Sequence, residues 1–446
     1  MYWEQPIQYA SISDIGFRRQ MNQDAYGVQI CPERETWEKY GHLFLVCDGM
    51  GGHAVGELAS KIAIDTIPLA FFKSREADVE TALKKAIELA NANINERGTQ
   101  NYDFQRMGTT CSALALGPKG AIIGHVGDSR VYRVRGDNIE QLTFDHSLQW
   151  ELLRQGKMSP EEIFLKEPRN VITRSLGPMP DVRVDVEGPH PIHPGDVYVL
   201  CSDGLTGHVN DAEIGMISRH LSPADASRLL VHLANLRGGS DNITVVIVRV
   251  GHVPEGLSES LAAPKNDQVE ASGALNWWWL LAIWVIAGLY VLGVCLILLE
   301  DVASGLISLS VALVATGASI LHWLAKKRHR LFFEDPMRRT TSGPYRIAST
   351  KLMPQFVSHL AALEAELQRT GAEEGWDIDW SRHQSASGNA QSFLAHNRLQ
   401  DALAEFASGL DILMSGVQMH RKYRQHQARW GKPPRPLPRS ADDKGS

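Results

Sequence analysis

Short apolar runs separated by polar, glycine-rich turns fill the first 251 residues of the chain. Apolar runs of this length that end at Gly, Asn or Asp are typical of β-strands. The strands that we predict are 42–48 (HLFLVCD), 109–116 (TTCSALAL), 120–127 (GAIIGHVG), 130–135 (RVYRVR), 196–203 (DVYVLCSD) and 242–250 (NITVVIVRV). Most of their connections are short or hairpin-like, which favours antiparallel sheets with helices packed outside over a doubly wound parallel sheet.

One helix is predicted strongly by its spacing, in the stretch DVETALKKAIELANANINERG at 78–98. Its apolar residues repeat every three or four positions and form one stripe, and Gly98 is a plausible C-terminal stop. The stripe consists of Val79, Ala82, Leu83, Ala86, Ile87, Ala90 and Ile94. Strands and helices together predict an α+β domain over residues 1–251.

The pattern changes completely after this domain. Residues 252–275 are rich in Pro, Gly, Ser and Ala and form a linker. Residues 276–299 and 302–325 contain no charged side chain, and each is long enough for the roughly 20 residues of a membrane-spanning helix. We therefore expect a transmembrane helical hairpin over 276–325, with a buried hairpin in a soluble core as the alternative. The basic run KKRHR at 326–330 places that side in the cytoplasm.

Residues 326–446 are predicted to form a cytoplasmic, α-helical region. Two stretches in it space Leu, Ala, Phe and Ile at helical intervals. They suggest either a plain helical hairpin or one tetratricopeptide-like pair, since a single copy does not establish a repeat. The region ends in a basic tail with prolines, which is either solvated or in contact with anionic lipid.

Composition adds little beyond excluding some classes of protein. The net charge is −6, so we expect no nucleic-acid partner. The five cysteines are far apart and form no C-x-x-C pair, which argues against a disulfide framework or a zinc site and for a reducing compartment. The N-terminus lacks a basic start and an apolar segment, so we expect no cleaved signal peptide.

Aspartates mark the ends of several predicted strands. Asp48 and Asp203 follow strands, Asp24 and Asp241 precede them, and Asp128 lies between two of them. A single aspartate at such a place is usually a turn residue. In antiparallel neighbours, however, the C-terminal end of one strand lies beside the N-terminal start of the next, so these carboxylates can converge on one edge.

Converging carboxylates need a cation or must take up protons. Oxygen ligands without a His or Cys cluster favour Mg²⁺ or Mn²⁺, and two such ions can activate water for attack on phosphorus. Gly49 is able to offer its carbonyl because glycine allows close approach to the backbone. Arg19 supplies a guanidinium that binds two phosphate oxygens. By itself such a residue is more often a surface arginine, but the aspartates beside it favour the phosphate role.

Seven motifs give this pattern a specific resemblance. SDIGFRRQMNQDAYGV, LFLVCDGMGGHAVGELAS, MGTTCSALAL, HVGDSRVYRVR, LTFDHS, VLCSDGLTGHV and GGSDNITVVIV occur in the order seen in the metal-dependent (PPM, or 2C-type) Ser/Thr protein phosphatases, most similarly in bacterial members. The resemblance covers about residues 5–250. It implies a four-layer αββα sandwich of two antiparallel sheets, with two Mn²⁺ or Mg²⁺ ions at one edge.

The resemblance also implies roles for individual residues. Asp48 resembles the carboxylate that bridges both metals, and Gly49 the carbonyl ligand. Asp203 and Asp241 resemble the other direct ligands, while Asp24 would hold a metal or one of its waters. By the same resemblance, Arg19 would bind the substrate phosphate and Asp128 would bind a third metal. Asn242 would support the metal ligands without touching a metal.

Three positions depart from the family pattern or stay open. Gln23 stands where Glu is common, which removes a negative charge beside the metals. Gly207 stands where many relatives have an Asp near the third-metal site, so the sequence leaves open whether a third ion binds. His53 is the candidate general acid, because an imidazole near neutrality can protonate a departing alkoxide, but extra residues in its loop leave its placement open.

These inferences predict a membrane-tethered phosphatase that hydrolyses phosphoserine and phosphothreonine in proteins phosphorylated by a cognate Ser/Thr kinase. We expect a multi-pass protein of a bacterial-type inner membrane, with the lipid bilayer as a partner. The alternatives are a catalytically weak pseudophosphatase that acts as a membrane scaffold or phosphoprotein sensor, and an assembly platform in which the helical tail carries the main function.

Overall fold

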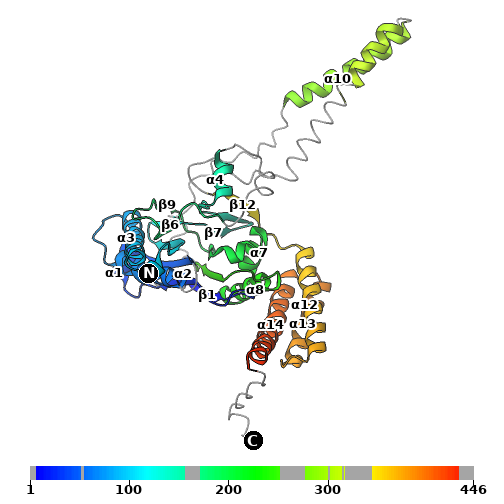
Figure 1. Ribbon diagram of the computed structural model, residues 1–446. Coiled ribbons are helices and arrows are strands. Elements are labelled where there is room, and N and C mark those ends of the chain that lie inside the picture. Colours follow the sequence, from blue (N-terminus) through cyan, green and yellow to red (C-terminus); the bar gives the residue numbers. More distant parts are fainter. Residues whose placement is uncertain are drawn as a thin grey trace. The chain divides into compact units, whose positions relative to one another are not determined.

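The computed structural model describes residues 7–51, 55–155, 171–251, 277–299, 302–313, 316 and 344–430 (Figure 1). The chain forms two compact units. One comprises residues 1–252 together with 339–446, and the other comprises residues 253–338. Each unit is described by itself below.

The first unit contains two antiparallel β-sheets. In the first sheet the order is β1 (Gln8–Asp14), β11 (Ile243–Arg249), β10 (Val197–Cys201), β7 (Arg130–Arg135), β8 (Asn138–Gln141) and β12 (Arg346–Ser349). In the second it is β2 (Asp24–Gln29), β3 (His42–Met50), β5 (Cys111–Gly117), β6 (Gly120–Val126) and β9 (Asp185–His190), with β4 (Gly108–Thr109) paired to β3. The antiparallel architecture predicted from the sequence is confirmed.

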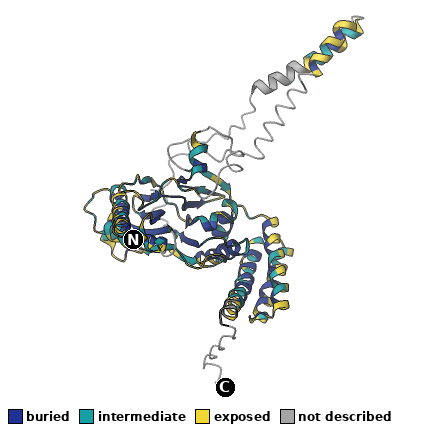
Figure 2. Ribbon diagram, in the orientation of Figure 1, coloured by how far each residue is buried: buried dark blue, intermediate teal, exposed yellow. Residues whose placement is uncertain are grey.

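Apolar side chains fill the space between the two sheets. Phe44 of β3 and Leu114 of β5 pack there against Tyr198 and Leu200 of β10 and Val246 of β11, and all five are fully buried. Because the strands are buried on both faces, their sequences are nearly continuous apolar runs. Figure 2 shows the strands as the most deeply buried part of the chain.

Helices cover the outer face of each sheet. The second sheet carries α2 (Val55–Phe72) and α3 (Val79–Gln100), and the first carries α7 (Asp211–His220) and α8 (Pro223–Leu236). The predicted apolar stripe of α3 is buried, and Asp78 caps the helix by accepting a hydrogen bond from the Thr81 amide. Gly98 does not stop the helix, which continues to Gln100; a Cβ atom at Gly98 would lie 3.2 Å from the Phe104 carbonyl oxygen.

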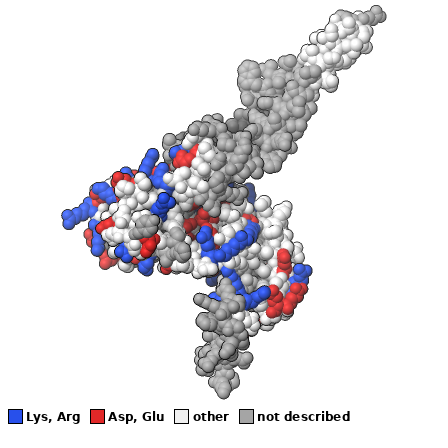
Figure 3. Space-filling view, in the orientation of Figure 1, with Lys and Arg blue, Asp and Glu red and all other residues white. Residues whose placement is uncertain are grey.

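Several short helices complete the first 251 residues. They are α1 (Arg34–Tyr40), the 3₁₀ turn η1 (Tyr102–Phe104), α4 (Leu148–Gln155) and α6 (Asp203–Thr206). Figure 3 shows Lys and Arg interspersed with Asp and Glu on the face that it presents. Such mixing is ordinary for a globular surface.

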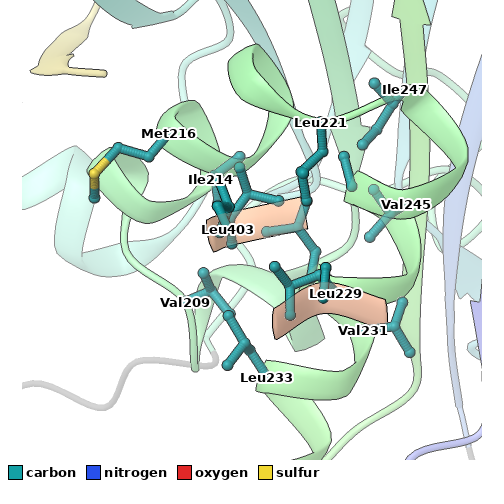
Figure 4. Packing of buried hydrophobic residues seen from close by; sticks show 14 of the residues in the cluster. Val209, Ile214, Met216, Leu221, Leu229, Val231, Leu233, Val245, Ile247 and Leu403 are labelled. Carbon is teal, nitrogen blue, oxygen red and sulfur yellow. The ribbon is translucent and has the colours of Figure 1, made fainter. Parts of the chain in front are cut away.

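The C-terminal residues of the same unit extend the first sheet and its helical layer. β12 pairs with β8 at the sheet edge, with Arg346 opposite Gln141. Three helices follow: α12 (Pro354–Glu374), α13 (Trp380–Ala395) and α14 (Leu399–Trp430). Leu403 of α14 lies among side chains of α7, α8 and β11, including Leu229 and Val245 (Figure 4). The helical character predicted for this region is confirmed, and these helices share one core with the outer layer of the first sheet.

The second unit contains α10 (Trp277–Leu298) and a helical run over residues 302–313. The Ser308 hydroxyl donates a hydrogen bond to the Leu289 carbonyl, so the two helical segments lie against each other as in a hairpin. The described side chains of α10 begin at Ala287.

The described residues contain no helix that is both long and apolar enough to cross a membrane. This finding corrects the predicted transmembrane spans 276–299 and 302–325. It also contradicts the predicted inner-membrane location, and the bilayer as a partner is not supported. Part of the second predicted span, residues 314–315 and 317–325, lies outside the described residues.

Candidate functional site

Two aspartates face each other at the end of the second sheet. Asp24, the first residue of β2, pairs directly with Asp48 of β3. Like charges in opposite positions of antiparallel strands destabilise the pairing. Burial, opposed by a hydrogen bond from Ser202, raises the pKa of Asp24 to about 7. Burial and then repulsion from Asp24 and Asp203 raise the pKa of Asp48 well above its usual range.

The first sheet brings two more aspartates to the same place. Asp203 follows β10 and begins α6, and Asp241 precedes β11. Because β10 and β11 are antiparallel neighbours, these two positions lie at one edge. Burial and repulsion from Asp241 raise the pKa of Asp203. The Ser202 hydroxyl donates a hydrogen bond of 2.7 Å to Asp24 and thereby joins the edges of the two sheets.

Asp128 lies in the turn between β6 and β7, where the chain passes from one sheet to the other. Its side chain is buried, and its Oδ1 atom has no hydrogen-bond partner among the described residues. Burial and then repulsion from Asp203 raise its pKa well above the usual range, while Arg130 acts in the opposite direction. The Oδ1 atom of Asp203 is likewise buried without a partner in this part of the chain.

These observations fit hard divalent cations. The unpartnered oxygens and the raised pKa values show carboxylates that lack sufficient positive charge. Carboxylate oxygens are the ligands that Mg²⁺ and Mn²⁺ prefer. Within the described ranges, no three His, Cys, Asp or Glu side chains already stand in the arrangement of a metal cage. The case for divalent cations therefore depends on the raised pKa values of the carboxylates and on their buried oxygens without hydrogen-bond partners.

Gly49 is required by the packing around the acidic edge. A Cβ atom at this position would lie 2.2 Å from the Gly56 carbonyl oxygen and 2.5 Å from that of Gln23. The carbonyl of Asp48 is already held by the Thr110 amide at 2.8 Å and the Thr109 hydroxyl at 2.9 Å. The backbone on which Asp48 and Gly49 are carried is thus fixed on both sides.

Arg19 lies on the loop between β1 and β2 and forms an ion pair of 2.7 Å with Asp241. The Arg19 side chain is 47% exposed and that of Asp241 is 28% exposed. An ion pair this exposed contributes little stability, so the guanidinium is available to an incoming anion. The fold therefore brings Arg19 to Asp241, 222 residues away in the sequence.

Asn242 holds the same loop from behind. Its side-chain amide donates hydrogen bonds of 2.9 Å to the carbonyls of Ile15 and Met21, and its oxygen accepts one of 2.9 Å from the Gln23 amide. The Gln23 carbonyl in turn accepts hydrogen bonds from Gly49 at 3.1 Å and from the Ser60 hydroxyl at 2.6 Å. His53, the candidate general acid, lies outside the described residues.

Three supporting side chains were not predicted from the sequence. Thr110 accepts a hydrogen bond from the Asp48 amide at 2.9 Å, and Ser202 binds Asp24. Arg130 is held by Asp145 through bonds of 2.7 to 3.0 Å, close to Asp128. Each stands in a motif quoted above (MGTTCS, VLCSDG and VGDSR), and a polar residue within an apolar strand pattern is the signal that marks it.

Comparisons with known proteins agree with this geometry. A protein-family model described as protein phosphatase 2C matches residues 18–228. The chain is 34% identical over 246 residues to protein phosphatase PhpP of Streptococcus pneumoniae serotype 2, covering 54% of this chain and 97% of that protein. It is 35% identical over 255 residues to serine/threonine phosphatase stp of Listeria innocua, covering 56% and 98% of the two chains.

A solved structure gives the same picture. The S. agalactiae serine/threonine phosphatase is 35% identical, with a TM-score of 0.50 over 55% of this chain and all (100%) of that one. These matches cover nearly the full length of each relative and slightly more than half of this chain. The chain belongs to the bacterial type of the protein phosphatase 2C family and is a serine/threonine protein phosphatase.

Proposed function

We propose that this phosphatase hydrolyses phosphoserine and phosphothreonine in proteins with the help of two Mn²⁺ or Mg²⁺ ions held at the acidic edge. Its substrates would be proteins phosphorylated by a Ser/Thr kinase of the same cell. Membership of a metal-dependent family supports the ions. The observation that carries the proposal is the direct pairing of Asp24 with Asp48 across β2 and β3, beside Asp203 and Asp128.

Two carboxylates in such a pair repel each other unless a cation or protons intervene. Near neutral pH, divalent cations offset this repulsion and make the edge stable and functional at once. The residues that would hold them are Asp48, the Gly49 carbonyl, Asp203, Asp241 and Asp24. A third ion, at Asp128, is proposed on the basis of its unpartnered buried oxygen.

When bound, the ions supply positive charge that lowers the pKa of a water molecule and neutralises phosphate oxygens. The other tasks belong to side chains of this chain. Arg19 would bind two phosphate oxygens in a bidentate fork and hold the phosphorus in line for attack. Asn242 would keep the loop of Arg19 in place, and Ser202 would fix the orientation of Asp24.

The leaving serine or threonine oxygen needs a proton. His53 is proposed as the general acid that donates it, since an imidazole titrates near neutral pH. A His53→Gln variant tests this role through the pH profile of kcat. We expect the variant to lose kcat most at acidic to neutral pH with protein substrates, where the wild-type imidazole carries the proton that it donates. The loss should be least with aryl phosphates, whose leaving groups need no proton. Equal losses with both substrates would remove His53 from the mechanism.

The acidic edge is tested by the Asp48→Asn and Asp203→Asn variants of the full chain. Each should lower Mn²⁺-dependent hydrolysis of a phosphothreonine peptide by about 10²-fold or more, because Lewis-acid stabilisation contributes several kcal/mol. Asp65→Asn, an exposed position on α2, is the matched control and should keep wild-type activity. Wild-type rates in Asp48→Asn would contradict the proposal.

A further inference from the structure

The last helix of the chain reaches the loop that carries Arg19. Arg421 of α14 donates hydrogen bonds to the carbonyls of Gly16, at 3.1 Å, and Phe17. Its guanidinium also lies over the Phe17 ring, 4.8 Å from the centroid. A planar guanidinium suits this combined contact, because it can stack on a ring and donate in a fixed fork. One side chain from the far end of the sequence thus binds two consecutive residues just before Arg19.

The position of this loop controls where Arg19 can point. The amides of Phe17 and Arg18 donate to the Gly239 carbonyl at 2.8 and 3.0 Å. Gly16 has a φ of +77°, and a Cβ atom there would lie 2.1 Å from the carbonyl oxygen of Asp241. The Arg19 side chain is half exposed and has Asp241 as its ion-pair partner. Its direction therefore depends on the loop backbone, which Asn242 and Gly239 hold on one side and Arg421 holds at the carbonyls of Gly16 and Phe17.

The helix that presents Arg421 is firmly anchored. Asp411 of α14 binds His232 of α8 at 2.8 Å and lies 3.5 Å from Arg228. Leu403, Phe406 and Leu410 are fully buried in the core that α14 shares with α8. The family match ends at residue 228, so Arg421 comes from a part of the chain outside it.

We propose that Arg421 is a positioning residue for phosphate binding. It would hold the backbone of Gly16 and Phe17 so that Arg19 stands beside Asp241 and meets the substrate phosphate without reorganisation. Positioning of this kind lowers the cost of ordering a group on binding. The inference rests on the proposed role of Arg19, and the C-terminal helices thereby become part of the phosphate site.

The test compares inhibition by inorganic phosphate, KM, kcat and melting temperature in variants of the full chain at saturating Mn²⁺. In Arg421→Ala we expect the phosphate inhibition constant and KM to rise together by about tenfold. A change of this size corresponds to a fraction of the free energy of a hydrogen bond to a charged group. We expect kcat to stay within about twofold, since the lost binding is shared by substrate and transition state. Arg421→Lys keeps the charge and one donor, so its phosphate inhibition constant and KM should lie between those of wild type and Arg421→Ala.

Two control variants separate positioning from other effects. Lys422→Ala removes a neighbouring exposed positive charge and should leave the phosphate constant unchanged. Asp411→Asn weakens the contact of α14 with α8 and should lower the melting temperature without changing the phosphate constant. The proposal would be overturned if Asp411→Asn raised the phosphate inhibition constant as much as Arg421→Ala does, because the effect would then come from helix packing.

A double variant links Arg421 to Arg19. If Arg421 acts through Arg19, the Arg19→Ala/Arg421→Ala protein should bind phosphate no more weakly than Arg19→Ala alone. Additive losses, or a wild-type phosphate constant in Arg421→Ala, would overturn the positioning role while leaving Arg19 as the phosphate ligand. A wild-type constant in Arg19→Ala would instead refute the proposed role of Arg19, and this inference with it.

Discussion

Replacing Asp24 by Asn should make the metal-free protein more stable at neutral pH. The change removes the negative charge that faces Asp48 across β2 and β3 but keeps an oxygen that can accept the hydrogen bond from Ser202. Burial raises the pKa of Asp24 from 3.8 to about 7. Each tenfold change in proton affinity corresponds to about 1.36 kcal/mol, so the ionised carboxylate costs the folded state up to about 4 kcal/mol.

The pH dependence of this cost follows from the direction of the shift. Because the folded-state pKa lies above the unfolded value, stability is fully present below about pH 4 and is lost as the pH rises through about 7. The advantage of Asp24→Asn should therefore be largest near pH 8. At pH 5 it should fall below about 2 kcal/mol, since Asp24 is then mostly protonated in the folded protein.

Urea unfolding of wild type and Asp24→Asn in EDTA, at pH 5 and pH 8, measures this difference. Adding Mn²⁺ at 100 times its Kd should narrow the difference at pH 8, because ligand at that concentration stabilises the protein that binds it by about 2.7 kcal/mol. Asp65→Asn serves as the control for removing an exposed charge. A lower stability of Asp24→Asn in EDTA at pH 8 would refute the reasoning that a buried, ionised Asp24 carboxylate destabilises this edge.

Three further variants test other parts of the structure. Gly49→Ala should destabilise the protein by about 1–3 kcal/mol and abolish Mn²⁺-dependent turnover, because its Cβ would lie 2.2 Å from the Gly56 carbonyl oxygen. A wild-type melting temperature together with near-wild-type activity would contradict this. Leu403→Ala should lower the unfolding free energy in urea by about 2–5 kcal/mol through a cavity beneath α14, and a change below about 1 kcal/mol would show that α14 is not part of the core. Ser202→Ala leaves Asp24 without its 2.7 Å donor and should weaken Mn²⁺ affinity in calorimetry; unchanged affinity would remove Ser202 from the site.

The strands and the acidic edge were predictable because local patterns determine them. Apolar runs such as HLFLVCD are long and are bounded by turn residues, so the sequence predicts both the strand and the residue at which it ends. The meeting of Asp24 with Asp48 follows from the alternation of strand direction in an antiparallel sheet, which the short connections already indicated. The seven motifs then specified the family.

Long-range packing was not predictable from the same patterns. β12 is a four-residue strand, RIAS, whose pairing with β8 depends on a partner about two hundred residues earlier in the chain. The contact of Arg421 with Gly16 and Phe17 has no local signal either, because a basic residue near a helix end usually remains solvated. Gly98 shows that a local stop signal places a helix end only approximately, since the helix ends two residues later, at Gln100.

The membrane prediction failed for a related reason. A charge-free run predicts burial but does not identify whether lipid or protein covers it. The two described segments contact each other through the bond from Ser308 to Leu289, and none of the described helices meets the requirement for a span.

The central claim is that aspartates from two sheets form one divalent-cation site. Titration calorimetry of Mn²⁺ into metal-free wild type and Asp48→Asn at pH 7.5 tests it most directly. The account predicts at least two ions bound per chain in wild type and the loss of at least one of them in Asp48→Asn. Equal stoichiometry and affinity in the two proteins would contradict it.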